Sequence, residues 1–323
     1  MKISVIVPVY NAELTLGHAL EGLKRQSFRD FEVVFVDDCS TDGSAGIMRS
    51  FAESGGIPCQ IVRQERNEGV ATARNRGLDA ARGDYLAFLD ADDSVPEESF
   101  QTAISALKPD TDILGWDWHL GFEKNARYMR QADYATPVEA VKNLMGGTMR
   151  WNLWLFLVRR KLLKDNGIRF INGANMGEDM QFMIRAFLAA KEVVQVHEPL
   201  YIYNAVSTSS ISRQFSEERR REIEVNLAEV EKVVRASGCP ADLSDYVNYL
   251  KLYLKLPLLV SPDVADYRLW HGWFPESNGF AMANKALPLR TRLLQHFAAH
   301  QNWFAVKLYY LAVHKFVYGL LYR

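Results

Sequence analysis

Along the first hundred residues, the apolar positions follow two different patterns. Unbroken apolar runs predict buried strands at residues 2–9, 31–36, 57–62 and 85–89. Between them, apolar residues recur every three or four positions and predict helices that end near residues 27, 54 and 81. This β-α-β-α-β-α-β order predicts a mostly parallel α/β sheet with helices on both faces and right-handed crossovers.

Beyond residue 100 the pattern is less regular. It predicts strands at 112–120 and 155–158, helices at 137–145 and 180–190, and short strands at 193–196 and 200–203. From Ser216 onward the sequence changes to long, charged amphipathic helices. We therefore expect a boundary near 207–215, which separates an α/β domain at 1–213 from an α-helical extension at 214–323.

The composition argues against one class of protein and indicates a cellular compartment. The 323 residues carry a formal net charge of -1, whereas a nucleic-acid-binding protein normally has a basic excess. Cys39, Cys59 and Cys239 have no metal-ligand spacing, which fits a reducing compartment. No charged-then-apolar leader precedes the first strand, and no apolar run is long enough to span a bilayer. We expect a cytoplasmic protein, or a peripheral one on the inner face of the cell membrane.

Three polar clusters follow predicted strands of the sheet. They are Tyr10-Asn11, Asp37-Asp38 and the acidic run at 90–93. Ligands of such sheets bind at the carboxyl ends of the strands, where all three clusters fall. There the Tyr10 ring can stack on a nucleobase, and Asp38 can accept a hydrogen bond from a base N–H.

The acidic run suits a divalent cation. Carboxylates this close repel one another unless a cation lies among them, and oxygen ligands favour Mg²⁺ or Mn²⁺. The alternative is a polar turn in which Asp93 or Ser94 caps the next helix before Pro96. Because no Gly-rich phosphate loop is present, a metal together with Arg74 would have to neutralise a diphosphate.

A general base is the other requirement if a nucleoside diphosphate is the leaving group. Asp179, beside Glu178 at a predicted helix start, is the best-placed candidate. The helix dipole alone also favours acids at that position. His197 and the tryptophans at 116, 118, 151 and 154 are expected to be mainly structural, although one or two tryptophans could stack on a sugar.

Five motifs together resemble a family 2 glycosyltransferase of the GT-A fold. They are the segments 5–11, 36–44, 67–75 (Asn67-Glu68-Gly69 with Ala73-Arg74-Asn75), 88–93 and 177–179, and they cover roughly residues 1–213. The resemblance implies a metal-dependent, inverting transfer of a sugar from a nucleotide donor, usually a UDP-sugar, to an acceptor hydroxyl. It implies a nucleotide-sugar half at roughly 1–110 and an acceptor half at roughly 111–213.

The resemblance also implies individual roles. Tyr10 and Asp38 would contact the base, Asp90 would lie near the ribose, Asp92 would bind the metal, and Asp179 would be the catalytic base. The same motifs contribute the remaining expected donor-binding residues, which are Pro8, Asn11, Arg74 and Ala91.

The sequence departs from this family at one position. Phe156 stands where bacterial members often have a lysine or arginine, so Arg159, Arg160 and Arg213 become alternatives for a basic contact. A Ser-rich segment at 207–212 matches a loop that could cover the diphosphate as a lid.

The C-terminal segment 285–323 is basic and rich in aromatic residues. Its cations are interleaved with apolar residues and no acid occurs between them: Lys285, Arg290, Arg292, Lys307, Lys315 and Arg323. Such a segment fits an anionic membrane surface. The alternatives are packing on the catalytic domain or on a second subunit, as in a homodimer.

The leading hypothesis is synthesis of a cell-surface polysaccharide, capsule or lipid-linked oligosaccharide, with a glycan or lipid-linked acceptor. Two alternatives remain open: a nucleotide-sugar-binding protein without catalysis, and a nucleotidyltransferase on a similar sheet. The nucleotidyltransferase would need a Gly-rich, basic loop after the first strand, which residues 10–13 do not supply. The sugar, the acceptor and the linkage are not encoded in these motifs.

Overall fold

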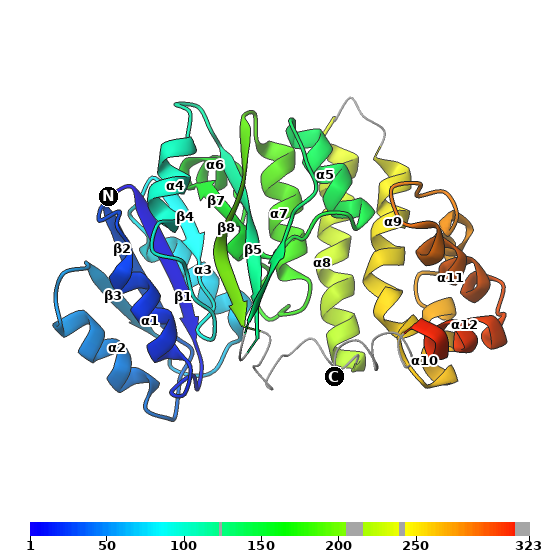
Figure 1. The fold of residues 1–323 in the computed structure, drawn as a ribbon, viewed down its shortest axis with the longest axis horizontal. Helices are drawn as coiled ribbons and strands as arrows, with labels where there is room; N and C mark the ends of the chain where they lie inside the picture. Colours follow the sequence, from blue (N-terminus) through cyan, green and yellow to red (C-terminus); the bar gives the residue numbers. More distant parts are fainter. Residues whose placement is uncertain (123–124, 205–215, 239–242, 314–323) are drawn as a thin grey trace. The chain divides into compact units, whose positions relative to one another are not determined.

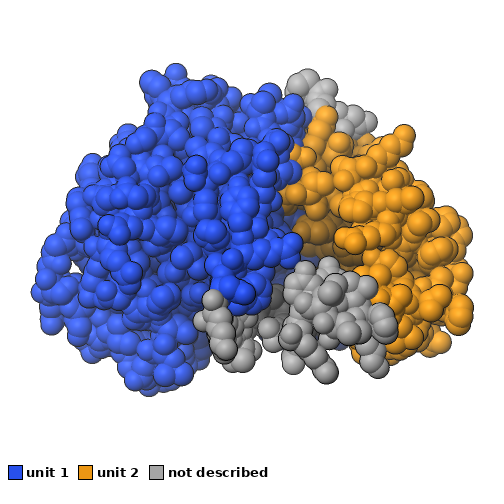
Figure 2. Space-filling view, viewed as in Figure 1, with its two compact units in different colours: residues 1–140, 150–237 blue, residues 141–149, 238–323 orange. Residues whose placement is uncertain are grey.

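The computed structural model describes residues 1–122, 125–204, 216–238 and 243–313. The chain divides into two compact units, which are coloured separately in Figure 2. Unit 1 comprises residues 1–140 and 150–237, and unit 2 comprises residues 141–149 and 238–323. Each unit is described by itself.

Unit 1 is built on one sheet, which has eight strands in the described part of the chain. The strands are β1 (Ile3–Val9), β2 (Phe31–Asp37), β3 (Cys59–Arg63), β4 (Tyr85–Phe88), β5 (Ile113–Gly121), β6 (Ala126–Met129), β7 (Phe156–Arg159) and β8 (Val193–Asn204). Their order is β3-β2-β1-β4-β7-β5-β6, and β8 pairs with β5. The first four strands are parallel, while β7 runs antiparallel to both β4 and β5.

Helices cover both faces of the parallel strands, as the sequence predicts. Figure 1 shows α1 (Leu16–Arg25) and α2 (Ser44–Glu53) on one face, and α3 (Val70–Ala80) on the other. On the α3 face, Ala73 packs against Val34 and Val36, and all three side chains are fully buried. Because both faces are covered, β1 and β2 are almost continuous apolar runs rather than alternating ones.

The second half of the sheet differs in detail from the prediction. The expected short strands at 193–196 and 200–203 are one strand, β8, whose pairing with β5 shifts around Asp117 at a bulge. The bulge lies where Pro199 interrupts the strand, since proline has no N–H for the ladder. The pattern did not reveal two elements, β6 and α6 (Arg160–Asp165), and the helix considered after the acidic run is α4 (Ser99–Ala106), which begins later than expected.

The remaining helices complete the two units. They are α5 (Pro137–Gly146), α7 (Glu178–Ala189), α8 (Glu217–Ala236), α9 (Ser244–Lys255), α10 (Val264–Gly272), α11 (Leu289–Ala299) and α12 (Trp303–Tyr309). The predicted α/β class with a C-terminal α-helical region is confirmed. The predicted boundary at 213/214 lies outside the described residues and stays a prediction; α8 packs on α7 and belongs to unit 1.

Unit 2 is helical where the structure describes it. Its core contains a buried cation, Lys255, whose ammonium lies 4.2 Å from the centre of the Trp270 ring and donates to the carbonyl oxygen of Trp273 at 2.9 Å. Burial lowers the pKa of Lys255 to about 7. Within the described residues, no helix combines the length and apolarity that a membrane crossing requires.

A glycine fixes the distance between α3 and β1. A Cβ atom on Gly77 would lie 2.4 Å from Cγ2 of Ile6, a core residue, so Gly77→Ala overpacks this contact. We expect a loss of about 1–3 kcal/mol in the free energy of unfolding, measured by urea denaturation.

Gly17→Ala in α1 is the matched control, because nothing lies within 4 Å of its added Cβ. It should be neutral or stabilise by up to about 1 kcal/mol. Equal effects of both variants would contradict this interpretation.

Candidate active site

The loops after β1 and β2 lie side by side at the carboxyl edge of the sheet. The Asp38 N–H donates to the Val9 carbonyl at 2.8 Å, and Asn11 Oδ1 accepts from the Thr41 N–H at 2.8 Å. Asn11 has a φ of 48°, a left-handed conformation that asparagine tolerates better than most residues. Its side chain therefore ties the two loops together. Tyr10, between them, is 51% exposed, so its ring is accessible to a ligand. Pro8 is half-buried on β1.

Asp38 organises the turn that starts α3. Its Oδ1 accepts from the Glu68 N–H at 2.8 Å, and its Oδ2 accepts from the Gly69 N–H at 2.9 Å. Gly69 has a φ of 86°, and a Cβ there would lie 2.4 Å from Nδ2 of Asn175, so only glycine fits. Gln64 also donates to Oδ1. Since a carboxylate has about four lone-pair sites, Oδ2 keeps capacity for one ligand N–H.

Arg74 is the centre of the candidate site. It projects from α3, and its side chain is only 5% exposed. One terminal nitrogen donates to Glu178 at 2.8 Å and to Asp179 at 2.7 Å, and the other donates to Asp90 at 3.3 Å. The structure thus brings three predicted site residues, Arg74, Asp90 and Asp179, into direct contact. The guanidinium is committed to carboxylates, which differs from the expected contact with a diphosphate.

The charges of this cluster do not balance. Burial raises the pKa of Asp90 to about 6 against the opposing effect of Arg74. Burial, with Asp179 adding to it, also raises the pKa of Glu178. Burial opposes the charge on Arg74, but Asp179, Asp90 and Glu178 together raise its pKa above the usual value. One cation faces more carboxylates than it can neutralise, so an additional cation would be stabilised here.

Asp93 is buried and joins the acidic turn to β8 by hydrogen bonds. It is not the helix cap considered from the sequence. Its Oδ2 accepts from the Tyr201 hydroxyl at 2.7 Å, and its Oδ1 accepts from the Asn204 N–H at 2.8 Å. Burial raises the pKa of Asp93 to about 8, and Asp90 adds to the shift. The next helix, α4, begins at Ser99, beyond the reach of Asp93. The acidic turn is therefore held by the end of β8.

Asp92 is the one member of the acidic run whose carboxylate has no hydrogen-bonding partner in the described part of the chain. Its main-chain carbonyl accepts from Asn204 Nδ2 at 2.7 Å, which fixes the turn, while Ala91 beside it is half-buried. No group of three His, Cys, Asp or Glu side chains suited to a metal occurs among the described residues. A single carboxylate beside unbalanced acids fits Mg²⁺ or Mn²⁺ if phosphate oxygens and water complete the coordination.

Several basic residues considered for the donor lie elsewhere. Arg159 pairs with Tyr85, the first residue of β4, and the Arg160 N–H donates to the Asp84 carbonyl at 2.8 Å. Both arginines are therefore at the amino edge of the sheet and cannot replace the basic contact, which is a correction. Phe156 is fully buried in the core. Arg213 and the Ser-rich segment 207–212 lie outside the described residues.

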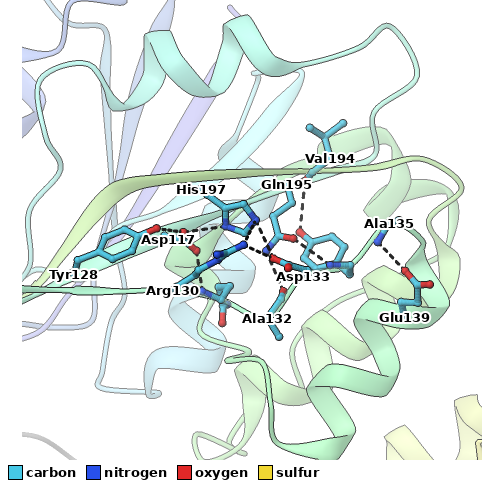
Figure 3. A network of polar contacts seen from close by, with 12 residues as sticks. Asp117, Tyr128, Arg130, Ala132, Asp133, Ala135, Glu139, Val194, Gln195 and His197 are labelled. Atoms are coloured by element: carbon cyan, nitrogen blue, oxygen red, sulfur yellow. Dashed lines mark hydrogen bonds and ion pairs between the residues drawn. The ribbon is translucent and has the colours of Figure 1, made fainter. Parts of the chain in front are cut away.

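The expected structural role of His197 agrees with its contacts. His197 belongs to β8, and in Figure 3 its ring lies among Asp117, Arg130 and Asp133, with Nδ1 3.0 Å from Asp117 and Nε2 3.0 Å from Asp133. Asp117 is fully buried and also accepts from the Gln131 N–H at 2.8 Å. The network holds the segment after β6 against β8. Trp116, Trp118 and Trp154 are at most 6% exposed and belong to the core, while Trp151 is half-buried.

Sequence reasoning missed the residues beyond position 110 that support the site. Asn175 accepts from the Ala71 N–H at 3.0 Å and stabilises the start of α3. The Tyr201 hydroxyl also accepts from the Asp90 N–H at 3.2 Å, and the Tyr201 ring stacks on Trp154 with centroids 4.4 Å apart. Nothing local in the sequence marks these residues, because their partners are about a hundred positions away.

Comparison with protein families identifies what the chain resembles. The family model described as "Glycosyl transferase family 2" matches residues 4–182. A *Bacillus subtilis* protein described as the uncharacterized glycosyltransferase EpsJ is 28% identical over 257 residues, which is 76% of this chain and 74% of that protein. The poly(ribitol-phosphate) beta-N-acetylglucosaminyltransferase TarS of *Staphylococcus aureus* is 30% identical over 207 residues, 63% of this chain and 35% of TarS.

Solved structures share the fold. *S. aureus* TarS 1–349 in complex with UDP-GlcNAc has a TM-score of 0.70 at 21% identity, covering 100% of this chain and 93% of that one. The mannosyltransferase PcManGT from *Pyrobaculum calidifontis*, in complex with GDP-Man and Mn²⁺, has a TM-score of 0.55 at 19% identity, covering 99% and 88%. The predicted GT-A architecture is confirmed by this likeness.

Removing Arg74 should destabilise unit 1 strongly. Arg74→Met leaves Glu178 and Asp179 buried without their cation, so we expect a loss of about 3 kcal/mol in the free energy of unfolding. Adding Glu178→Gln should recover part of this loss, as a double-mutant cycle would measure. Arg169→Met is the control, because its pair with Asp79 at 2.7 Å is about half exposed and worth about 1 kcal/mol or less. Similar losses for the two arginines would refute the central role of Arg74.

Proposed function

Because this chain belongs to glycosyl transferase family 2, we propose that it moves a sugar from a nucleotide-diphosphate donor to an acceptor hydroxyl with inversion. A UDP-sugar is the proposed donor. The nucleotide complexes of the structural relatives TarS and PcManGT support a nucleotide-sugar donor, and TarS supports the uridine base.

The observation that carries the proposal is the arrangement at the carboxyl edge of the sheet. After β4, the Asp92 carboxylate has no partner among the described residues, and Tyr10 presents an exposed ring after the neighbouring strand β1. Asp38 lies beside Tyr10 and keeps a free lone pair. These three groups match three features of a nucleotide sugar. The aromatic ring matches the face of the base, the carboxylate acceptor matches an N–H on the edge of the base, and the metal-binding oxygen matches the diphosphate.

In the proposed reaction Asp179 is the general base. Its Oδ1 is held by Arg74 at 2.7 Å, and the backbone N–H of Leu153 lies 3.4 Å from its Oδ2. As the acceptor oxygen forms its bond to the anomeric carbon, its proton passes to Asp179 and the bond from that carbon to the diphosphate oxygen breaks. The nucleoside diphosphate leaves with the bonding electrons. Attack from the opposite side inverts the anomeric configuration. Arg74 orients the carboxylate of Asp179, the proposed general base.

The leaving diphosphate requires charge compensation. Asp92 would hold Mg²⁺ or Mn²⁺ there, and the bound cation would supply electrostatic stabilisation of the diphosphate. The Mn²⁺ complex of PcManGT supports the use of a divalent cation. Asp90, already hydrogen-bonded to Arg74, would lie near the ribose and would not need to bind the metal.

We propose a glycan or lipid-linked acceptor in cell-surface polysaccharide synthesis, reached from the inner face of the membrane. The support is a basic surface in unit 2 that carries exposed apolar side chains. Phe304 and Leu308, four residues apart on α12, are 80% and 56% exposed, and Leu289 is 55% exposed. No acid occurs in residues 277–323. Of the six expected cations, Lys315 and Arg323 lie outside the described residues.

Asp179→Asn should separate catalysis from binding. The amide cannot accept the proton, so we expect sugar transfer to fall by about 10²–10⁴-fold while UDP affinity stays within about threefold. Transfer is measured as UDP release with a panel of UDP-sugars and glycan acceptors, and UDP affinity by calorimetry. Wild-type protein that binds UDP but neither transfers nor hydrolyses any donor would favour the binding protein without catalysis.

Asp92→Asn should weaken the cooperation between metal and donor. We expect Mn²⁺ to raise the thermal stability of the wild-type protein in the presence of UDP and to have little effect on the variant. Asp110→Asn, an exposed acid after α4, is the control and should behave like the wild type. Removal of metal with EDTA should abolish transfer. An unchanged response of Asp92→Asn would remove Asp92 from the metal site.

The proposed membrane contact can be tested with the full chain. Phe304→Ser/Leu308→Ser should reduce flotation with phosphatidylglycerol vesicles at least threefold, because it removes exposed apolar area from a basic surface. Leu14→Ser is the matched control, since Leu14 is 97% exposed but lies in unit 1. If the wild-type protein does not float with anionic vesicles, the membrane contact is wrong, and sedimentation would then test a homodimer.

A further inference from the structure

A cavity lies at the edge of the sheet opposite to the candidate active site. Its volume is about 760 Å³, and it is lined where β1 and β4 begin, where β7 ends and along α6. The donor-site residues follow the carboxyl ends of β1 and β4, so the two sites are at opposite ends of the same strands. Lys2 and Tyr85 belong to the cavity, whereas Tyr10 and Asp90 belong to the active site.

Basic side chains outnumber acidic ones in the lining of the cavity. Six basic side chains line it, against two acidic ones, Asp84 and Asp165. The basic residues are Lys2, Lys108, Arg159, Arg160, Lys161 and Lys164. Four of them are ion-paired, namely Lys2 with Asp84, Lys161 with Asp165, Lys108 with Glu192 and Arg159 with Asp112. Arg160 and Lys164 have no ion-pair partner among the residues that the structure describes, so they carry the uncompensated charge of the cavity.

Two arginines in the lining are oriented by the protein itself. Arg159 Nε donates to the Thr111 carbonyl at 2.9 Å, and one of its terminal nitrogens donates to the Pro109 carbonyl at 2.7 Å. Arg160 Nε donates to the Gly83 carbonyl at 2.7 Å. Anchoring through Nε restricts the guanidinium groups while terminal N–H groups of each remain for a ligand. Preorganised guanidinium groups of this kind suit phosphate oxygens.

The rest of the lining is apolar or aromatic. Ile104, Leu107 and Pro109 contribute to the wall, and the Arg159 guanidinium lies 5.2 Å from the centre of the Tyr85 ring. A bare inorganic ion would leave this wall unused. A ligand that joins a phosphate group to an organic part would contact both kinds of surface.

We propose that this cavity is a binding site for an organic phosphate, distinct from the nucleotide-sugar site. The phosphate group is recognised by Arg159 and Arg160, with Lys161 and Lys164 adding charge from α6. Its source is either a soluble phosphate ester or the head group of an anionic phospholipid. The site does not depend on the proposed transferase activity, because it shares no residue with the candidate active site.

Calorimetry with glycerol 3-phosphate tests the soluble source. We expect Arg160→Gln/Lys164→Gln to weaken binding at least tenfold. Arg49→Gln, an exposed arginine on α2, and Asp92→Asn in the active site should bind like the wild type. Lys161→Gln/Lys164→Gln changes only exposed side chains and should weaken binding at least threefold, so the test holds even if loss of Arg160 impairs folding.

Flotation with phosphatidylglycerol and phosphatidylcholine vesicles tests the lipid source. It is carried out in the Phe304→Ser/Leu308→Ser background, so that any contact through α12 is removed. Binding only to phosphatidylglycerol, lost with Lys161→Gln/Lys164→Gln, assigns the site to a lipid head group. Binding of glycerol 3-phosphate with the same dependence assigns it to a soluble ester. The proposal is overturned if the wild-type protein binds neither probe, or if the cavity variants bind as well as Arg49→Gln.

Discussion

The buried guanidinium of Arg74 is the interaction on which the geometry of the candidate active site depends. It joins α3 to the start of α7 through Glu178 and Asp179, and it joins both to the turn after β4 through Asp90. Buried ion pairs contribute little net stability compared with apolar packing, but they are costly to break. Their value here is geometric, since one side chain sets the positions of Asp179 and the acidic turn relative to each other. Its Nε is buried without a partner in the described chain, which is consistent with a geometry dictated by the carboxylates.

The acidic turn is held from the other side by β8. Tyr201 and Asn204 hydrogen-bond to Asp93 and to the backbone of Asp90 and Asp92, so the turn is restrained on both sides of the Asp92 side chain. Within the described residues the Asp92 carboxylate has no hydrogen-bonding partner, because its neighbours make the structural contacts. The three carboxylates within four positions therefore have different environments: one is paired with arginine, one is buried between a hydroxyl and an N–H, and the third is the proposed cation ligand.

Much of the sheet and of the candidate site could be predicted from the sequence, for a physical reason. Strands buried on both faces are apolar runs, and parallel topology sends their carboxyl ends to one edge, so Tyr10, Asp38 and Asp90 were predicted together from local patterns. The partners of those residues could not be predicted in this way. Arg74 was expected to meet phosphate, because spacing along the chain does not reveal that α7 brings two acids to it. Arg159 and Arg160 were considered for the donor because the sequence pattern does not show that β7 reverses direction and places them at the amino edge of the sheet.

The hydrogen bonds between Asp93 and β8 limit which segments of the chain can be exchanged between related proteins. The acidic turn belongs to the first hundred residues, whereas Tyr201 and Asn204 come from the last strand of the unit. A gene fusion that exchanged the segment after residue 110 for that of a paralogue would therefore inherit a functional turn only if the incoming strand supplied an equivalent hydroxyl and asparagine at its end.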